Sequence, residues 1–145
     1  MSQARNTELR PGYLVKRVQQ LIRHASDVEL RNIGLSMSQY AVLNALSDHP
    51  GASSAELARR CFVTRQSLQD VLSGLRSCGL VSESGRPARG RARSLELTAV
   101  GAKRLAAAHA AVMGVESAMT DGISASARRQ LVAALTRCAE NLEAG

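Results

Sequence analysis

The side chains with the most specific chemistry in this sequence are Arg65, Gln66 and Gln69, which fall within five consecutive positions. The apolar residues of the same stretch recur at helical spacing and would share one buried stripe: Leu68, Val71, Leu72 and Leu75. Arginine and glutamine can make paired hydrogen bonds to the edges of guanine and adenine. A short helix that begins near Thr64 and carries them on its outer face therefore suits the major groove of DNA.

A second, shorter helix is expected directly before this one. Ser53 is a good N-cap, and Glu56 three residues later can complete a capping box. Phe62 and Val63 carry the chain across the turn, and Thr64 caps the following helix. The pattern indicates a helix-turn-helix, although an ordinary helical hairpin with a polar outer face has the same spacing. We include Ser53 and Thr64 among the expected DNA-binding residues.

An arginine-rich segment follows the second helix. Its cations lie within eight positions, among glycine and proline: Arg86, Arg89, Arg91 and Arg93. The apolar pair Leu80 and Val81 precedes the segment. After it, Leu95 and Leu97 alternate with polar residues, which is the period of a half-buried strand. We expect a two-stranded hairpin whose tip reaches the minor groove and the phosphates, with a solvated flexible loop as the alternative.

The positive charge of the chain is concentrated around these elements. The chain has 145 residues and a net charge of +7, and residues 53–104 contribute +6 of that charge, with ten Lys or Arg against four Asp or Glu. A basic block in an otherwise near-neutral chain is typical of a DNA-facing surface. Two Tyr, one Phe and no Trp are too few rings for a base-stacking platform, which disfavours single-stranded nucleic acid. Double-stranded DNA is the expected partner.

Other classes of function find little support in the sequence. No glycine-rich phosphate loop, metalloprotease helix or nucleophile elbow occurs, so we expect no enzyme, no catalytic residue and no cofactor. The three histidines are dispersed, which disfavours a metal site. No apolar run approaches the length of a membrane span, and the N-terminus lacks the apolar core of a signal peptide. We therefore expect a cytoplasmic protein of one domain without a membrane partner.

Two helices are expected before the helix-turn-helix. Pro11 suits the first turn of a long helix that runs to about residue 31, while the residues up to Leu9 are polar and expected to be frayed. Ser36 and Gln39 can form a capping box at the start of the next helix. A loop is expected at residues 47–51, SDHPG.

Two further helices are expected after the hairpin. Thr98 caps an alanine-rich helix with an apolar stripe from Val100 to Met119, and the last helix covers about residues 124–143. Together with the first helix they are more apolar than a monomer needs, and paired half-sites favour a two-fold dimer. We expect the first helix to pack against the last two, with coverage of the core within one chain as the alternative. The expected division is a dimerisation layer at 10–34 and 98–143 and a DNA-binding lobe at 35–97.

This order of elements resembles the MarR family of transcriptional regulators over roughly residues 10–143. The segments that carry the resemblance are GLSMSQYAVLNAL, ELARRCFVTRQSL, LRSCGLV and LELTAVGAKRL. The resemblance implies a mostly helical homodimer with a small two-stranded β-wing and one winged helix-turn-helix per subunit. It also implies a repressor of short palindromic sites that a small aromatic or phenolic ligand releases from DNA.

When the family pattern is matched to this sequence position by position, the sequence departs from it at two places. In the wing, Arg91 keeps the family's minor-groove arginine, but Arg89 stands where the family usually has the aspartate that orients it. Phe62 stands where many relatives have glycine. A bulky residue at that position suggests a turn that is fixed by packing and not by a left-handed backbone.

The resemblance also places a ligand pocket between the first helix, the start of the second and the DNA-binding lobe. The matching positions in this sequence are Tyr13, Arg17, Gln20, His24, Met37 and Tyr40. The four on the first helix are spaced four, three and four residues apart and share one face. A cation with polar and aromatic neighbours can hold an aromatic carboxylate, and ordinary solvated helix surface is the alternative.

Three cysteines leave a redox-sensing regulator as an alternative. Cys61 and Cys138 fall on apolar stripes, whereas Cys78 ends the recognition helix and is the most plausible exposed thiol. No cysteine occurs near the start of the first helix, where redox-sensing relatives usually have one. Two further alternatives stay open: an architectural DNA-binding protein without sequence preference, and a helical module that binds a partner and never touches DNA.

Overall fold

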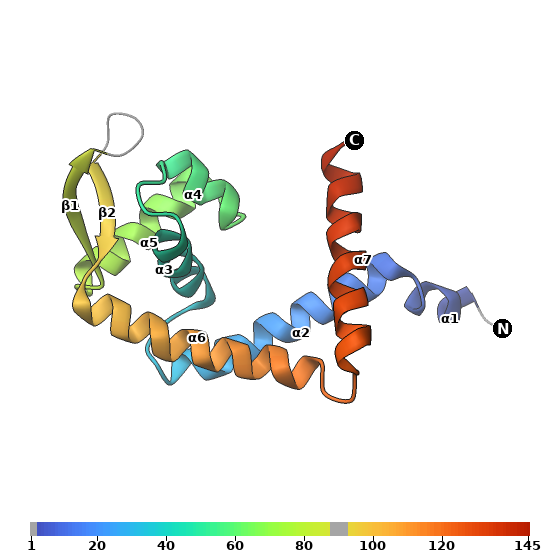
Figure 1. Cartoon of the computed structure of the whole chain (residues 1–145). Coiled ribbons are helices and arrows are strands. Elements are labelled where there is room, and N and C mark those ends of the chain that lie inside the picture. Colours follow the sequence, from blue (N-terminus) through green and yellow to red (C-terminus); the bar gives the residue numbers. More distant parts are fainter. Residues whose placement is uncertain (1–2, 88–92) are drawn as a thin grey trace.

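Helices dominate the chain, of which the computed structural model describes residues 3–87 and 93–145. The described residues form seven helices and one two-stranded sheet: α1 (Gln3–Glu8), α2 (Pro11–Arg31), α3 (Met37–Asp48), α4 (Ser54–Arg60), α5 (Arg65–Ser77), β1 (Val81–Pro87), β2 (Arg93–Leu97), α6 (Ala99–Met119) and α7 (Ala125–Glu143). Figure 1 shows α3, α4, α5 and both strands gathered in one lobe, and α2 and α6 run side by side away from it. The predicted mostly helical fold with a small β-wing is confirmed.

Polar caps begin the helices at the positions that the sequence predicts. Before α3, the Gln39 backbone N–H donates to Ser36 Oγ at 3.1 Å, and the Ser36 N–H donates to Gln39 Oε1 at 2.9 Å, which completes the capping box. Before α4, Ser53 Oγ accepts the Glu56 N–H at 3.2 Å, and only this half of the predicted box forms. The other capping hydroxyls each accept an N–H three residues further on: Thr64, Thr98 and Ser124.

The core lies within the lobe and at its junction with α2 and α6. Its buried large side chains include Leu30, Val42, Leu43, Leu57, Leu68, Leu72, Leu75, Leu80 and Leu105. Three of these leucines form the buried stripe predicted for α5. Because burying one leucine stabilises a fold by roughly 1.5–3 kcal/mol, this stripe fixes α5 in the lobe and leaves its opposite face to solvent.

The start of α6 is held tightly against the point where α5 ends and the wing begins. The Thr98 N–H donates to the Leu80 carbonyl oxygen at 3.0 Å, and Thr98 Oγ1 donates to the Gly79 carbonyl oxygen at 2.6 Å. Gly101 in the first turn of α6 is buried, and a Cβ at this position would overlap the Leu80 carbonyl group. Only glycine allows the helix to approach the lobe so closely.

The turn between α4 and α5 differs from the expectation. Phe62 has a φ of 56°, the one positive value among the described non-glycine residues, and its side chain is 95% exposed. The Phe62 N–H donates to the Arg59 carbonyl oxygen at 3.2 Å. The Val63 N–H donates to the Ala58 carbonyl oxygen at 3.0 Å, and these two bonds end a helix through a left-handed residue. The prediction that packing of Phe62 fixes the turn is therefore wrong, because the helix-ending hydrogen bonds impose the left-handed backbone.

Three smaller expectations are also corrected. Residues up to Leu9 were expected to be frayed, yet α1 forms within them as a six-residue helix. The helix α3 continues to Asp48, so the following loop begins at His49. Val100 is exposed and does not belong to the buried stripe of α6, because the first turn of that helix faces the lobe through Gly101.

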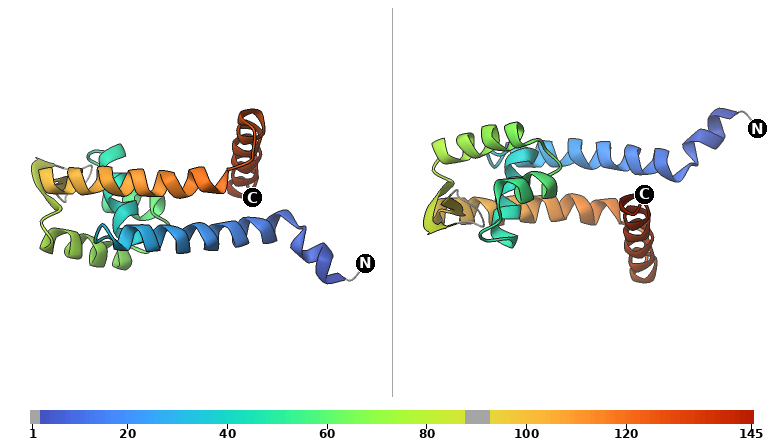
Figure 2. Two further views of the ribbon diagram at one scale, coloured as in Figure 1. Left: turned by 90° about the horizontal axis from the view of Figure 1, so that it is seen from below. Right: turned by 90° about the horizontal axis from the view of Figure 1, so that it is seen from above.

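The last helix stands apart from the others. The expected packing of the first helix on the last two holds for α6, which lies along α2, but α7 has no comparable contact with α2 in the described part of the chain. Figures 1 and 2 show α7 turning away at the far end of α6, opposite the lobe. None of its residues is buried. No helix in the described ranges is long and apolar enough to cross a membrane.

Candidate nucleic-acid interface

The outer face of α5 gathers the polar residues that the sequence assigns to DNA. Arg65, Gln66 and Gln69 are exposed, whereas Leu68 on the other side of the helix is fully buried. Thr64 caps the helix, and its Oγ1 accepts a backbone N–H at 3.0 Å. The structure thus presents an arginine and two glutamines in the first two turns of a short helix whose opposite face is fixed in the core.

Hydrogen bonds orient two of these side chains. Gln66 Nε2 donates to Asp70 Oδ1 at 3.2 Å, one helical turn further on. Gln69 Nε2 donates to Ser54 Oγ at 3.5 Å, at the start of α4. This role of Asp70 was not predicted from the sequence. The residue lies four positions after Gln66, which is the spacing at which side chains on one helix face can interact. A carboxylate on this face can accept a hydrogen bond from the amino group of cytosine.

The wing is an antiparallel hairpin beside α5 (Figure 1). Val81 pairs with Leu97, Pro87 pairs with Arg93, and the register shifts between Glu83 and Pro87. The alternation expected for the second strand is present, since Leu95 and Leu97 are half-buried and Glu96 between them is exposed.

The remaining expected DNA-binding positions are distributed over the lobe. Ser53 lies at the start of α4, where its hydroxyl accepts the helix-capping hydrogen bond. Arg86 lies in β1 and Arg93 in β2, so the backbone places both on the hairpin. Arg89 and Arg91 lie outside the described residues.

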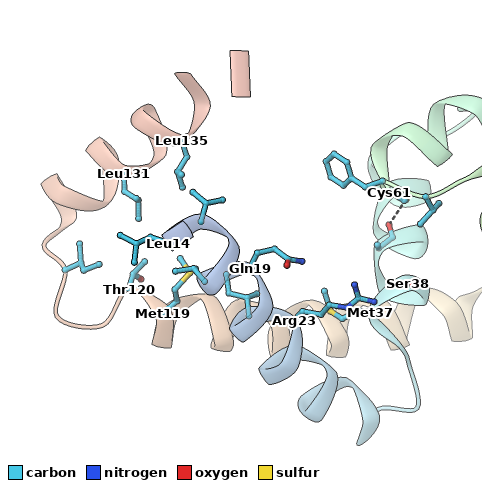
Figure 3. Close-up of a pocket in the computed structure, with 17 residues that line it drawn as sticks. Leu14, Gln19, Arg23, Met37, Ser38, Cys61, Met119, Thr120, Leu131 and Leu135 are labelled. Carbon is cyan, nitrogen blue, oxygen red and sulfur yellow. Dashed lines mark hydrogen bonds between the residues drawn. The ribbon is translucent and has the colours of Figure 1, made fainter. Parts of the chain in front are cut away.

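An apolar cleft of about 710 Å³ opens between the lobe and the far end of the molecule. Its walls are formed by α2, the start of α3, the turn before α5, the end of α6 and α7. Figure 3 shows Arg23 beside Met37 and Ser38 at one end, and Leu131 and Leu135 of α7 near Leu14 at the other. Arg23 is the one charged side chain among the residues that line the cleft.

Of the six residues that were expected to bind a ligand, one lines the cleft. Met37 lines it. The four expected positions on α2 are all exposed but do not line it: Tyr13, Arg17, Gln20 and His24. The α2 residues that do line it include Gln19 and Arg23, which the sequence reading missed. The two residues are four positions apart, and this spacing places both along the edge of the apolar stripe of α2.

Tyr40 is buried in the lobe and also lies outside the cleft lining. Its hydroxyl is hydrogen-bonded to His109 Nδ1 on α6 at 3.1 Å. Burial raises the pKa of Tyr40 above the usual 10.0, and the carboxylates of Asp48 and Glu116 raise it further. The phenol is therefore held in its neutral form and links α3 to α6.

The three cysteines differ in burial. Cys61 is half-buried, lines the cleft, and its Sγ donates to the Ala41 carbonyl oxygen at 3.6 Å. Burial raises the pKa of the Cys61 thiol, which lowers the fraction of reactive thiolate. Cys138 was expected on a buried stripe but is exposed, as is Cys78. Within the described ranges, no three His, Cys, Asp or Glu residues gather into a group that could hold a metal ion.

The buried support of α5, its polar outer face and the adjoining hairpin define a protein of the winged helix-turn-helix class. A model of the MarR family matches residues 33–92, which include α3, α4, α5 and the first strand of the wing. The HTH-type transcriptional repressor Rv2887 of Mycobacterium tuberculosis is 34% identical to this chain over 119 residues, which are 82% of this chain and 86% of that protein. The chain belongs to the MarR family, and it is a DNA-binding transcriptional regulator of the MarR type.

Solved structures of the same relative align with the chain over most of its length. The crystal structure of Rv2887 in complex with DNA has a TM-score of 0.73 at 30% identity and covers 89% of this chain and 97% of its own. The complex of Rv2887 with salicylic acid has a TM-score of 0.73 at 32% identity and covers 89% of this chain and 96% of its own.

Proposed function

We propose that this chain is a repressor that binds a palindromic operator as a homodimer and leaves the DNA when a small aromatic acid binds. The observation that carries the proposal is the outer face of α5, where Arg65, Gln66 and Gln69 are exposed on a helix whose leucine stripe is buried. Two such helices read paired half-sites when two lobes are related by a two-fold axis. The proposed division is a pair of dimerisation segments, 10–34 and 98–143, and a DNA-binding lobe, 35–97.

In each lobe, α5 enters the major groove and the wing follows the backbone beside it. Arg65 and Gln69 read base edges, while the backbone N–H groups near Ser53 and Thr64 face phosphates at the N-termini of α4 and α5. The arginines of the wing contact the minor groove and phosphates: Arg86, Arg89, Arg91 and Arg93.

The homodimer is supported by the apolar surface that a single chain leaves in solvent. The exposed large apolar residues of the two flanking segments include Leu14, Val15, Val18, Leu21, Val132, Leu135 and Leu142. Four of them line the same cleft, namely Leu14, Val15, Val18 and Leu135, and an exposed apolar patch marks an interaction site in a soluble protein. An isologous contact between two copies buries the same residues on both chains.

The ligand is supported by the chemistry of the cleft. Its walls are largely apolar and suit an aromatic ring, and the Arg23 guanidinium can pair with a carboxylate. The relative Rv2887 has been crystallised with salicylic acid and with p-aminosalicylic acid. The exposed face of Tyr13, Arg17, Gln20 and His24 is the second candidate position for the same kind of ligand.

The proposal is tested by selecting bound fragments from genomic DNA and then measuring affinity for the recovered operator and for a base-scrambled duplex of equal length. At physiological salt the operator should bind at least about 10³-fold more tightly. Addition of salicylate should weaken binding to the operator. Equal affinity for both duplexes over a range of salt concentrations would instead identify an architectural protein, and no affinity for either would identify a partner-binding module.

A further inference from the structure

Asp70 is the one acidic residue of α5, the helix that presents Arg65 to solvent. It is exposed, although it lies within residues 53–104, where ten Lys or Arg face four Asp or Glu. Among the described residues, no lysine or arginine forms an ion pair with it. A carboxylate on a face that approaches DNA is repelled by the phosphates. A hydrogen-bond donor on the DNA is therefore needed to offset that repulsion.

Asp70 and Gln66 lie at the middle of the outer face of α5. Successive residues of a helix are about 100° apart around its axis. Because Gln66 lies two positions before the fully buried Leu68 and Asp70 lies two positions after it, both are on the side opposite to the core. Gln69 lies to one side of this pair, where its Nε2 donates to Ser54 Oγ of α4 at 3.5 Å. The part of α5 that projects furthest from the core is therefore occupied by Gln66 and Asp70.

A hydrogen bond within the helix orients the Asp70 carboxylate. Gln66 Nε2 donates to Asp70 Oδ1 at 3.2 Å. The reversed amide would place Gln66 Oε1 against the carboxylate, where two acceptors repel each other, so the amide is fixed in one orientation. The bond leaves Asp70 Oδ2 as an acceptor for a further donor. A side chain that is already ordered loses less conformational entropy when it binds.

The major groove offers few donors to such an acceptor. Cytosine presents its N4 amino group and adenine its N6 amino group, whereas guanine and thymine present acceptors there. The amino group of adenine lies beside the N7 acceptor, which repels the second carboxylate oxygen. Cytosine has a C–H group at the corresponding neighbouring position. A carboxylate in the major groove therefore favours cytosine over the other three bases.

We infer that Asp70 is a specificity-determining residue, whose carboxylate accepts a hydrogen bond from the N4 amino group of one cytosine in each half-site. This inference rests on the proposed entry of α5 into the major groove and specifies one base of the operator. Gln66 holds the carboxylate in place for that contact. The same negative charge weakens binding to every duplex that has no donor at this position, so it contributes to specificity by repulsion as well as by attraction.

Selection of bound duplexes from a random library tests the inference with the full chain and its variants. The unchanged chain should recover a motif in which one position of each half-site is cytosine. Asp70→Ala should lose the preference at that position and keep the others. Asp70→Asn should change the preference to adenine, because an asparagine amide pairs with adenine N6 and N7. The matched control is Asp121→Asn, the same change at an exposed residue between α6 and α7, far from the lobe, and it should recover the motif of the unchanged chain.

Affinity for single duplexes gives a second readout that needs no change in the protein. The selected cytosine is replaced by pyrimidin-2-one, a base that lacks only the N4 amino group and still pairs with guanine. The dissociation constant of the unchanged chain should rise by about 10-fold or more, because a hydrogen bond to a charged acceptor is lost. Asp70→Ala should bind the two duplexes equally. It should also bind a scrambled duplex more tightly than the unchanged chain does, because the charge that the phosphates repel is gone.

The outcomes separate this inference from the proposed function. If the unchanged chain recovers no motif, the proposed function and this inference are overturned together. If Asp70→Ala recovers the motif of the unchanged chain, or if the unchanged chain binds cytosine and pyrimidin-2-one duplexes equally, only the inference is overturned. A preference that changes at a base other than cytosine would show that Asp70 acts through Gln66 alone, and it would also overturn the inference.

Discussion

The hydroxyl of Tyr40 and the ring of His109 are hydrogen-bonded at 3.1 Å, and this contact joins the buried face of α3 to the middle of α6. The surrounding contacts at this junction are apolar, since Leu105 and Ala108 of α6 belong to the core. Tyr40 is buried whereas His109 is exposed, so the bond forms at the edge of the core. This polar contact and the packed apolar side chains around it therefore hold the middle of α6 against the lobe, in addition to the hydrogen bonds of Thr98 at the start of the helix.

Tyr40→Phe should lower the free energy of unfolding by about 0.5–1.5 kcal/mol. The loss is modest because His109 is exposed and can bond to water in the variant. Urea denaturation at a fixed protein concentration measures the change. Tyr13→Phe is the matched control, because Tyr13 is exposed on α2, and an equal loss in both variants would contradict the role of the contact.

The same tyrosine should make the protein sensitive to alkaline pH. The pKa of Tyr40 is raised above 10.0 in the folded chain, so between the two pKa values the unfolded chain has lost the phenolic proton and the folded chain retains it. Stability that depends on this group is complete below about pH 10 and is lost as the pH rises further. Urea denaturation at pH 8 and pH 10.5 should therefore show a smaller alkaline loss for Tyr40→Phe than for the unchanged chain, and parallel losses would contradict this prediction.

Gly101→Ala should lower the free energy of unfolding by about 3 kcal/mol, the upper part of the usual range for overpacking, because the new Cβ overlaps the backbone of Leu80. Gly114→Ala in the same helix is the matched control, since a Cβ there has open space around it. Replacing a helical glycine by alanine without a clash should stabilise by roughly 0.5–1 kcal/mol. Thermal denaturation should therefore show a lower melting temperature for Gly101→Ala and a higher one for Gly114→Ala. Equal changes in the two variants would show that α6 can move away from the lobe.

The elements that depend on neighbouring residues could be predicted from the sequence. The Ser36 and Gln39 capping box and the Thr64 cap need only residues three positions apart, and the leucines of α5 need only a helical period. The outward position of Arg65 follows from that period. These features are local, so the sequence determines them before the chain is packed.

The features that were missed depend on how distant elements meet. Phe62 takes a left-handed backbone because α4 ends with two specific hydrogen bonds, and the residue type alone indicated the opposite. Arg23 lines the cleft because the start of α3, with Met37 and Ser38, lies beside it (Figure 3), whereas Arg17 on the same exposed helix does not line it. The first turns of α2 are exposed on every side, so the spacing of residues along this helix does not indicate which of its faces lines a cleft.

Comparison of two substitutions at position 62 should isolate the cost of its backbone. Phe62→Gly and Phe62→Ala both remove the ring and any contact that it makes, and they differ only in a Cβ at positive φ. Phe62→Gly should therefore be the more stable variant by about 1 kcal/mol in urea denaturation at equal protein concentration. Equal stability would mean that the turn leaves the left-handed region once the ring is gone.

Arg65→Ala should reduce sequence preference as well as affinity. If Arg65 reads a base, its loss should weaken operator binding by about 1–3 kcal/mol and scrambled-duplex binding by much less. Arg129→Ala on α7 is the matched control, because it removes one exposed arginine far from the lobe. Fluorescence anisotropy with both duplexes measures the difference. An equal loss on every duplex would mean that Arg65 holds phosphate and reads no base.

Two arginines on α2 should distinguish the two candidate positions of the ligand. Arg23 lines the cleft and Arg17, almost two turns earlier, does not. Arg23→Ala should raise the salicylate concentration needed for half-release from the operator by at least about 10-fold, because a charge-assisted hydrogen bond is lost, while Arg17→Ala should leave it unchanged. Both variants should bind the operator normally without salicylate, which shows that the lobe is intact. The reverse pattern would move the ligand to the face of Tyr13, Gln20 and His24.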